Sequence, residues 1–158
     1  MPSAELPDLL DAVVIEASAV TSALAARDVD RFIVIGDLLA VPLAPPWLRG
    51  VALVDGAPAL VVDVAALPGP ASTAGRAVEE ARAQPYAGSA PPPTQVAIVC
   101  RVEGETVVLV GAQVRAIVRL RISARRGSTR AAEWRGVAIP VIDLEGLIAD
   151  AASSRELR

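Results

Sequence analysis

The stretch from Pro45 to Val64 constrains the fold of this chain most, because it consists of two apolar runs joined by an Asp55-Gly56 pair. Asp-Gly between apolar runs is the strongest short-range signal of a β-hairpin, since both turn positions require a positive φ angle. A weaker copy, with the order Trp, Arg-Gly-Val-Ala, apolar run and Asp, recurs between Trp134 and Asp143. The sequence therefore predicts two related halves, each built around such a strand pair.

Other short apolar segments predict further strands. A second hairpin is expected around a Glu103-Gly104 turn. Residues 18–26 are ambiguous between helix and strand, and residues 119–133 are arginine-rich and end the apolar pattern. The remaining strands are expected at 12–17, 29–35, 95–102, 106–110 and 113–118, and a terminal helix at 145–157. Seven or more short strands with two or three short helices indicate a mainly β barrel or sandwich.

Residues 68–94 differ in composition from the strands on either side. Pro68-Gly69-Pro70 opens this segment and a run ending in Pro91-Pro92-Pro93 closes it, with a short helix expected between them as far as Arg82. Because so long a connection is unusual in a compact domain, we expect a flexible insertion at 68–94.

Composition limits the class of protein. The chain has 158 residues, 53% of them hydrophobic and only 3% aromatic. We therefore expect one domain, or two small subdomains that share a core, built from Val, Leu, Ile and Ala. No apolar run approaches the ~18 residues of a membrane span. The single cysteine fits a reducing compartment and the N-terminus lacks the positive region of a secretory signal. These features predict a soluble cytoplasmic protein.

Residues that carry chemistry are scarce. The chain has no histidine, and with one cysteine it cannot build a zinc site, so we expect no metal and no cofactor. Cys100 lies in an apolar strand, where a thiol usually packs as a small hydrophobe. Asp63 and Asp143 take matching places in the two halves, and capping of the next turn or helix is a simpler interpretation than a carboxylate dyad. The sequence therefore predicts a protein that is not an enzyme.

Arginines form the one strong charge cluster. Three interpretations stay open for it: a basic patch for RNA or another acidic ligand, the rim of a protein interface, and a solvated loop. Net charge −3 argues against a general nucleic-acid coat. Trp47 and Trp134 are either exposed interface residues or core residues. The cluster comprises Arg115, Arg119, Arg121, Arg125, Arg126 and Arg130.

The first hairpin resembles a known family. The order Pro46, then Gly50-Val51, then Gly56, then Leu60-Val61-Val62-Asp63-Val64 is similar to the CheW family of chemotaxis coupling proteins. The resemblance implies a mainly β fold of two SH3-like five-stranded barrels with a few short helices. It also implies a single CheW-like domain over 1–158, with subdomain one at 12–67 plus a C-terminal contribution and subdomain two at 95–145.

The resemblance also implies a function. Members of the family are non-enzymatic adaptors that couple the cytoplasmic tips of chemoreceptors to a CheA-type histidine kinase. It leaves self-association open. The partner-binding groove that it implies comprises Val29, Gly50, Val54, Gly56, Val114 and Ile117.

The chain departs from the family at four positions. The family arginine is Asp55 here, an acidic residue is Arg31, an asparagine is Leu53 and an aspartate is Ala112. We infer a reversed charge pair, Arg31 with Asp55, that changes the polarity presented to a partner. The segment before Asp143 is short, so a strand pair is expected to be missing from the second barrel. A diverged adaptor with another signalling partner, or a basic RNA-binding module, is the alternative function.

Overall fold

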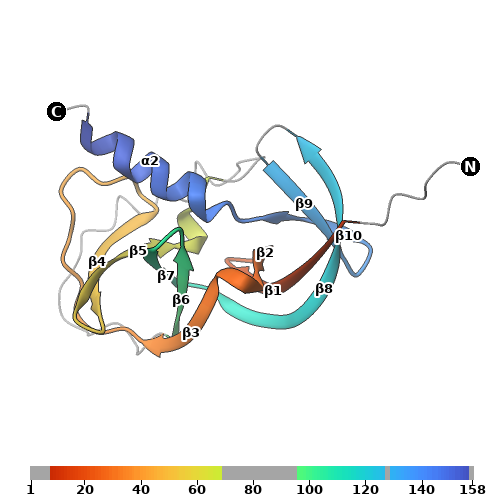
Figure 1. Cartoon of the computed structure of the whole chain (residues 1–158), viewed down its shortest axis with the longest axis horizontal. Coiled ribbons are helices and arrows are strands. Elements are labelled where there is room, and N and C mark those ends of the chain that lie inside the picture. Colours follow the sequence, from red (N-terminus) through yellow and green to blue (C-terminus); the bar gives the residue numbers. More distant parts are fainter. Residues whose placement is uncertain (1–7, 69–95, 127–128, 157–158) are drawn as a thin grey trace, which may run out of the picture. The chain divides into compact units, whose positions relative to one another are not determined.

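The computed structural model describes residues 8–68, 96–126 and 129–156, and within these ranges the chain is mainly β (Figure 1). Short 3-10 helices follow two of the strands, at Ala26–Asp28 and Val64–Ala66. One α-helix, α2, spans Leu144–Glu156. The strands are β1 (Leu9–Ala17), β2 (Val20–Ala25), β3 (Val29–Val34), β4 (Leu48–Val54), β5 (Ala57–Asp63), β6 (Val96–Val102), β7 (Glu105–Val110), β8 (Gln113–Arg126), β9 (Thr129–Trp134) and β10 (Val137–Val141).

Two compact units divide the chain. Unit 1 comprises Met1–Val29, Val102–Gly104 and Gln113–Arg158, and unit 2 comprises Asp30–Arg101 and Glu105–Ala112. The expected subdomains were 12–67 plus a C-terminal contribution and 95–145, whereas each of these units takes strands from both sides of the expected insertion. The insertion at 68–94 lies outside the described residues except for Pro68.

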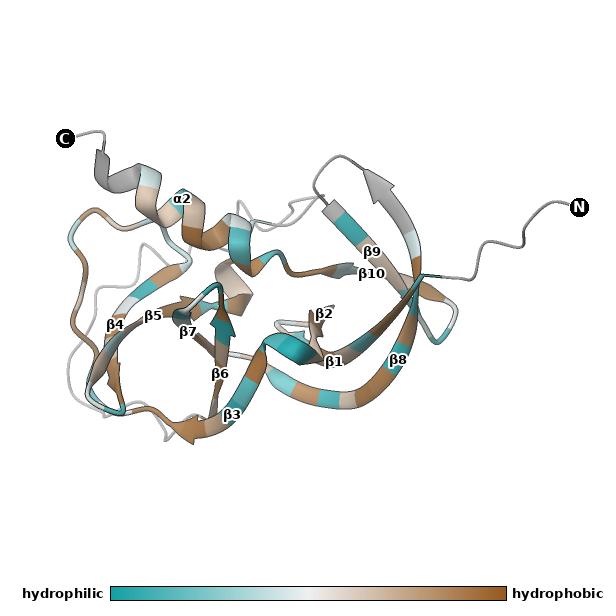
Figure 2. Cartoon of the chain, viewed as in Figure 1, coloured by the Kyte–Doolittle hydropathy of each residue, from teal (hydrophilic) through white to brown (hydrophobic). Residues whose placement is uncertain are grey.

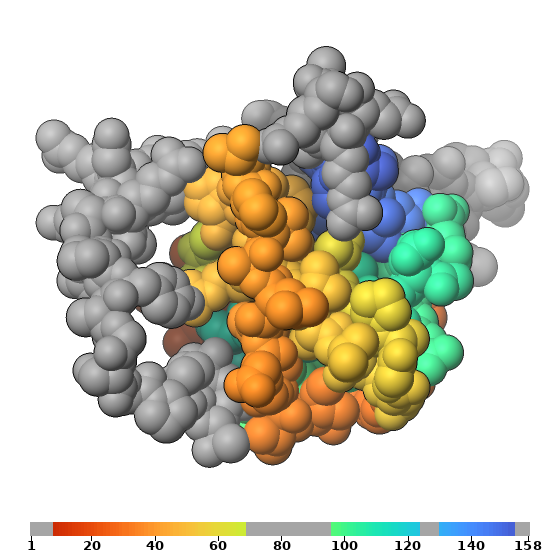
Figure 3. Space-filling model, turned by 90° about the vertical axis from the view of Figure 1, so that its left-hand side faces the viewer, coloured from red at the N-terminus to blue at the C-terminus, as the bar shows by residue number. Residues whose placement is uncertain are grey.

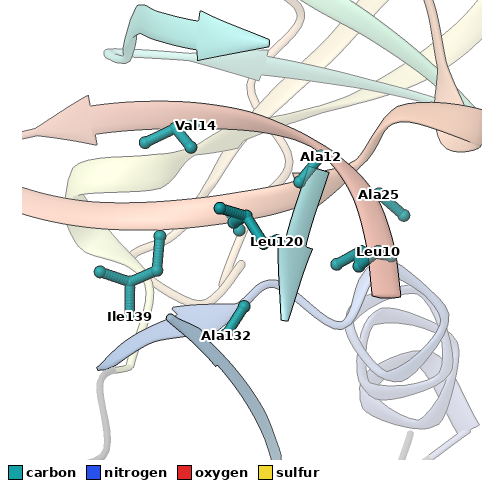
Figure 4. Packing of buried hydrophobic residues seen from close by; sticks show 8 residues of the cluster. Leu10, Ala12, Val14, Ala25, Leu120, Ala132 and Ile139 are labelled. Atoms are coloured by element: carbon teal, nitrogen blue, oxygen red, sulfur yellow. The ribbon is translucent and has the colours of Figure 1, made fainter. Parts of the chain in front are cut away.

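Unit 1 contains a closed five-stranded barrel in the order β1-β2-β10-β9-β8, with β8 pairing back onto β1. Alternate residues of its strands point inward, as the period of a β-strand requires. Figure 4 shows side chains from several strands pointing toward a common interior. The core of this barrel comprises Leu10, Ala12, Val14, Ala23, Ala25, Leu120, Ala132 and Ile139.

Unit 2 contains a five-stranded sheet in the order β3-β6-β7-β5-β4. Its edge strands, β3 and β4, are not paired with each other, so this sheet is open where the barrel of unit 1 is closed. Ile33 and Ile35 pack against the buried residues of its inner face. These buried residues are Ala52, Val54, Ala59, Val61, Ala97, Val99, Val108 and Val110.

The two units have the same strand order, and each half of the chain contributes its first hairpin to the sheet formed by the other half. The β1–β2 hairpin completes the sheet that contains β8, β9 and β10, whereas the β6–β7 hairpin completes the sheet that contains β3, β4 and β5. The second strand of each of these hairpins forms a parallel pair in the sheet that it completes. In unit 2, β7 pairs with β5, and in unit 1, β2 pairs with β10. The two halves of the chain, β1–β5 and β6–β10, are therefore structurally equivalent.

The predicted hairpins are present. Both residues of the Asp55-Gly56 turn have positive φ angles (52° and 79°), and so have both residues of the Glu103-Gly104 turn (50° and 85°). This backbone matches the right-handed twist of the flanking strands. The Trp-Arg-Gly copies, however, are not equivalent: Gly50 lies within β4, whereas Arg135-Gly136 is the turn between β9 and β10. The true counterpart of Arg135-Gly136 is Asp55-Gly56.

Two expectations from the sequence are wrong, and the ambiguity at residues 18–26 is resolved. Residues 119–133 are not a loop: β8 runs to Arg126, and Figure 2 shows alternating hydrophobic and hydrophilic bands along it. Residues 18–26 supply strand β2. No strand pair is missing, because each unit has five strands among the described residues. The arginine-rich stretch escaped prediction because its inward residues, Leu120 and Ile122 among them, alternate with arginines, and only the period of two identifies them.

Candidate functional site

The inferred pair of Arg31 and Asp55 is present in unit 2. Arg31 lies on β3 and Asp55 is the first residue of the β4–β5 turn, and the guanidinium donates a hydrogen bond to the carboxylate. This hydrogen bond, with the negative charge of Asp55, raises the pKa of Arg31. Both side chains are substantially exposed. The predicted contact is therefore confirmed, and it displays a cation on β3 and an anion at the turn.

Two further residues extend this pair into a chain of alternating charges. Arg31 Nη1 lies 3.2 Å from Asp30 Oδ2, and the same oxygen lies 3.4 Å from Nε of Arg101 on β6. The order Asp55, Arg31, Asp30, Arg101 thus links the β4–β5 turn with β3 and β6. Sequence reasoning missed Asp30 and Arg101, since only the pairing of β3 with β6 brings them together.

The remaining predicted site residues near β3, β4 and β5 are buried, half-buried or part of a turn. Val54 is 7% exposed and belongs to the inner core. Gly50 is buried, and a Cβ at this position would collide with the carbonyl oxygen of Leu39. Gly56 is exposed at the turn. Val29, the last residue of the first segment of unit 1, is half-buried at the start of β3 and donates its backbone N–H to the Ala26 carbonyl oxygen.

Val114 and Ile117 lie on β8 in unit 1, and both are exposed, by 41% and 72%. Ile117 pairs with Val13 of β1, and its side chain faces away from the barrel core, to which its neighbours Ala116 and Val118 belong. Because Val13 and Ile117 lie directly opposite each other, their side chains share the outer face of the barrel.

Two ion pairs between β8 and β1 flank Ile117. Arg115 Nη2 donates to Glu16 Oε1 at 2.8 Å, and Arg119 Nε donates to Asp11 Oδ1 at 2.8 Å. The hydrogen bond from Arg115 lowers the pKa of Glu16 and raises that of Arg115 itself. Because these arginines are matched by carboxylates, this part of the surface carries little net charge. An apolar centre within a polar rim is the usual anatomy of a protein interface.

The predicted groove therefore divides into two sets. Arg31, Gly50, Val54, Asp55 and Gly56 belong to unit 2. Val29, Val114 and Ile117 belong to unit 1. Within the sets, the structure brings together Arg31 with Asp55, and places Val114 and Ile117 on one strand.

The aspartates that follow the last strands are caps. Asp63 accepts a hydrogen bond from the backbone of Ala65 at 3.0 Å, and Asp143 accepts one from Gly146 at 3.0 Å. The second bond satisfies an N–H group in the first turn of α2, as an N-cap residue does. The capping interpretation is confirmed for both residues.

The cysteine and the two tryptophans considered in the sequence analysis are buried or pack against a core. Cys100 is buried. Trp47 is also buried. Trp134 packs on the barrel core, and the guanidinium carbon Cζ of Arg135 lies 4.6 Å from the centre of its ring. Across the described residues, no group of three or more Cys, Asp or Glu side chains could hold a metal ion. Within the same part of the chain, no helix is both long and apolar enough to cross a membrane.

A pocket of about 210 Å³ opens in unit 1 beside the start of α2. Its lining carries both signs of charge, from Arg27 and Arg130 and from Asp28, Asp143 and Glu145, and Arg27 Nε lies 3.8 Å from Asp28 Oδ1. Partial burial raises the pKa of Asp28, and the charge of Arg27 opposes this effect. Because the lining contains both arginine and carboxylate side chains, the pocket has no preference for an anionic or a cationic ligand.

Comparisons with known proteins agree with the fold. No family model matches the chain, and no curated protein matches it significantly. Among solved structures, the chain is similar to the scaffolding protein TtCheW from Thermoanaerobacter tengcongensis, with a TM-score of 0.57 and 14% identity. The match covers 88% of this chain and 90% of that one. At this identity the likeness shows the fold alone, which is CheW-like.

Proposed function

We propose that this protein is a non-enzymatic signalling adaptor that couples the cytoplasmic tips of chemoreceptors to the regulatory domain of a CheA-type histidine kinase. The observation that carries the proposal is the fold, which is similar to that of a scaffolding protein over 88% of this chain. An adaptor of this kind works in the cytoplasm by presenting preformed surfaces, and it has no need of a nucleophile or a cofactor.

The surface around Ile117 supports this function. It combines an exposed apolar residue with flanking ion pairs on a closed barrel, so its geometry is fixed before a partner arrives. A preformed surface reduces the entropy cost of binding. The same ion pairs weaken the case for an RNA-binding module, because Arg115 and Arg119 are already paired with carboxylates.

The pair of Arg31 and Asp55 favours a second candidate, an adaptor of the same fold that serves another signalling partner. The pair places the cation on β3 and the anion at the turn. Resemblance to the family implies the opposite arrangement. A partner matched to the family arrangement would meet like charges here, which costs affinity. The two candidates differ in the partner and not in the mechanism.

Binding calorimetry tests the proposal with the full chain, a receptor-tip fragment and the kinase regulatory domain from the same organism. We expect both to bind, and we expect Ile117→Asp to weaken one of them by about tenfold or more, since it places a charge in an apolar contact. Val137→Asp, at an exposed valine of β10, is the matched control. Binding to neither partner, with salt-sensitive RNA binding instead, would overturn the proposal.

A further inference from the structure

The outer face of the β4–β5 hairpin in unit 2 carries apolar side chains from three chain segments. Leu39 bridges to Val51 on β4, and Val51 is paired with Leu60 on β5. One step along the hairpin, Leu53 is paired with Pro58. Residues directly opposite each other in a sheet project to the same face, and Val51 and Leu53 are two positions apart, so all five side chains share one face.

Three residues of this face, Leu39, Leu53 and Pro58, are exposed within the described residues, and Val51 and Leu60 are half-buried. Leu39 is 72% exposed and Leu53 is 71% exposed, whereas Val54, next to Leu53 on the strand, is buried on the inner face. Figure 3 shows the orange segment that precedes β4 lying against the yellow β4–β5 hairpin. We name these five residues the hairpin face: Leu39, Val51, Leu53, Pro58 and Leu60.

The backbone beside this face is already hydrogen-bonded. Leu39 N–H donates to the Val51 carbonyl at 2.9 Å, and Val51 N–H donates to the Leu39 carbonyl at 2.9 Å. These bonds occupy the edge of β4 at the centre of the hairpin face. Pro58, on the partner strand, has no N–H group to offer. A partner that adds a β-strand needs a row of free backbone groups, so this face suits recognition by side chains alone.

The dimensions of the hairpin face match one α-helix. The row Leu39, Val51, Leu60 is three strands wide, or about 10 Å, which is close to the diameter of a helix with its side chains. Val51 and Leu53 lie about 7 Å apart along the strand, little more than one helical turn. A stable dimer interface needs roughly 20–30 residues a side, so five residues are too few for a second copy to form a lasting dimer through this face alone.

Two charged residues near the hairpin face have partners of opposite charge. Arg49 Nη1 lies 3.5 Å from Asp63 Oδ2, and Asp55 is paired with Arg31. The five residues of the face itself are all apolar, so an occupant is held mainly by its apolar side chains.

We propose that the hairpin face docks an amphipathic α-helix of a partner protein, through apolar residues spaced i, i+3, i+4 and i+7. This contact does not depend on the proposed adaptor function, because it lies on unit 2 and requires neither Ile117 nor a receptor.

The test uses the full chain and a designed peptide of about 18 residues, which is long enough to form a helix, with leucines at that spacing and a fluorescent label. We expect binding that changes little between low and high salt, because apolar contacts are not screened. Leu53→Ser and Leu39→Ser should each weaken binding by about tenfold. Both positions are exposed, so the variants should keep the unfolding temperature of the parent chain.

Three controls make the result decisive. Val137→Ser, at an exposed valine of unit 1, should bind the peptide as the parent chain does. A peptide of the same composition with scrambled leucines should bind at least about tenfold more weakly. Equal binding of the two peptides would overturn the proposal. So would tighter binding of an extended peptide with alternating apolar residues, or dimerisation of the chain that Leu53→Ser abolishes.

Discussion

Arg31 of β3 and Asp55 of the β4–β5 turn form an ion pair across the one place where the sheet of unit 2 is not closed by backbone hydrogen bonds. In the barrel of unit 1, the equivalent strands β8 and β9 are paired directly through their backbones. In unit 2, two side chains thus join edge strands that are hydrogen-bonded in the other unit. The pair is exposed, so its main consequence concerns what a partner meets there.

Neutralising either partner of this pair should alter binding more than stability. We expect Asp55→Asn to leave the unfolding temperature almost unchanged, because asparagine tolerates the positive φ of the turn and an exposed ion pair contributes little. The affinity of a charged partner should change several-fold. Thermal unfolding and calorimetry of Asp55→Asn, Arg31→Gln and the exchanged pair Arg31→Asp/Asp55→Arg measure both effects. A large fall in unfolding temperature for Asp55→Asn would contradict this view of the pair.

Gly50 should tolerate no side chain. Its Cβ would overlap the Leu39 carbonyl oxygen, which is held by the bridge to Val51 and cannot rotate away. We expect Gly50→Ala to lower the free energy of unfolding by about 2–4 kcal/mol, as measured by urea denaturation. Gly36→Ala is the matched control, since a Cβ there meets nothing within 4 Å. Equal stability of the two variants would show that the Leu39 segment can move aside.

The cap of α2 should be measurable by itself. Asp143→Ala removes the acceptor for the Gly146 N–H group and should cost about 1 kcal/mol of stability. Asp143→Asn keeps an oxygen acceptor and should lose much less. Urea denaturation followed by circular dichroism compares the two variants. If they lose the same amount, the negative charge at the helix end, and not the hydrogen bond, is what stabilises α2.

The raised pKa of Asp28 makes the free energy of unfolding depend on pH. Partial burial raises its pKa in the folded state, so folding favours the protonated acid. A raised pKa contributes stability below the ordinary pKa of the carboxyl, and this contribution is lost as pH rises through the folded value. Asp28→Asn should therefore raise the unfolding temperature slightly at neutral pH and leave it unchanged near pH 3. A gain of the same size at both pH values would exclude titration of Asp28 as the cause.

Local patterns predicted the hairpins well because turn chemistry is encoded in adjacent residues, as at Asp55-Gly56. They could not predict which strands close which sheet. β1 pairs with β8, and Asp11 meets Arg119 although 108 positions separate them. Alternation along β4 indicates that Val51 and Leu53 share a face, but only the bridge to Leu39 shows how far the apolar face extends. The charge pair of Arg31 with Asp55 was inferred from a family resemblance, which supplied the long-range information that composition lacks.

The exchange of hairpins has a consequence for how the protein is made. Neither sheet can be completed by the first half of the chain, because β1 and β2 must wait for β8, β9 and β10 to leave the ribosome. Pairings between residues so distant in sequence carry a large loop-closure cost and slow folding. The nascent chain therefore exposes unpaired strand edges until its synthesis is almost finished, and a truncation at the C-terminus leaves the N-terminal strands without partners.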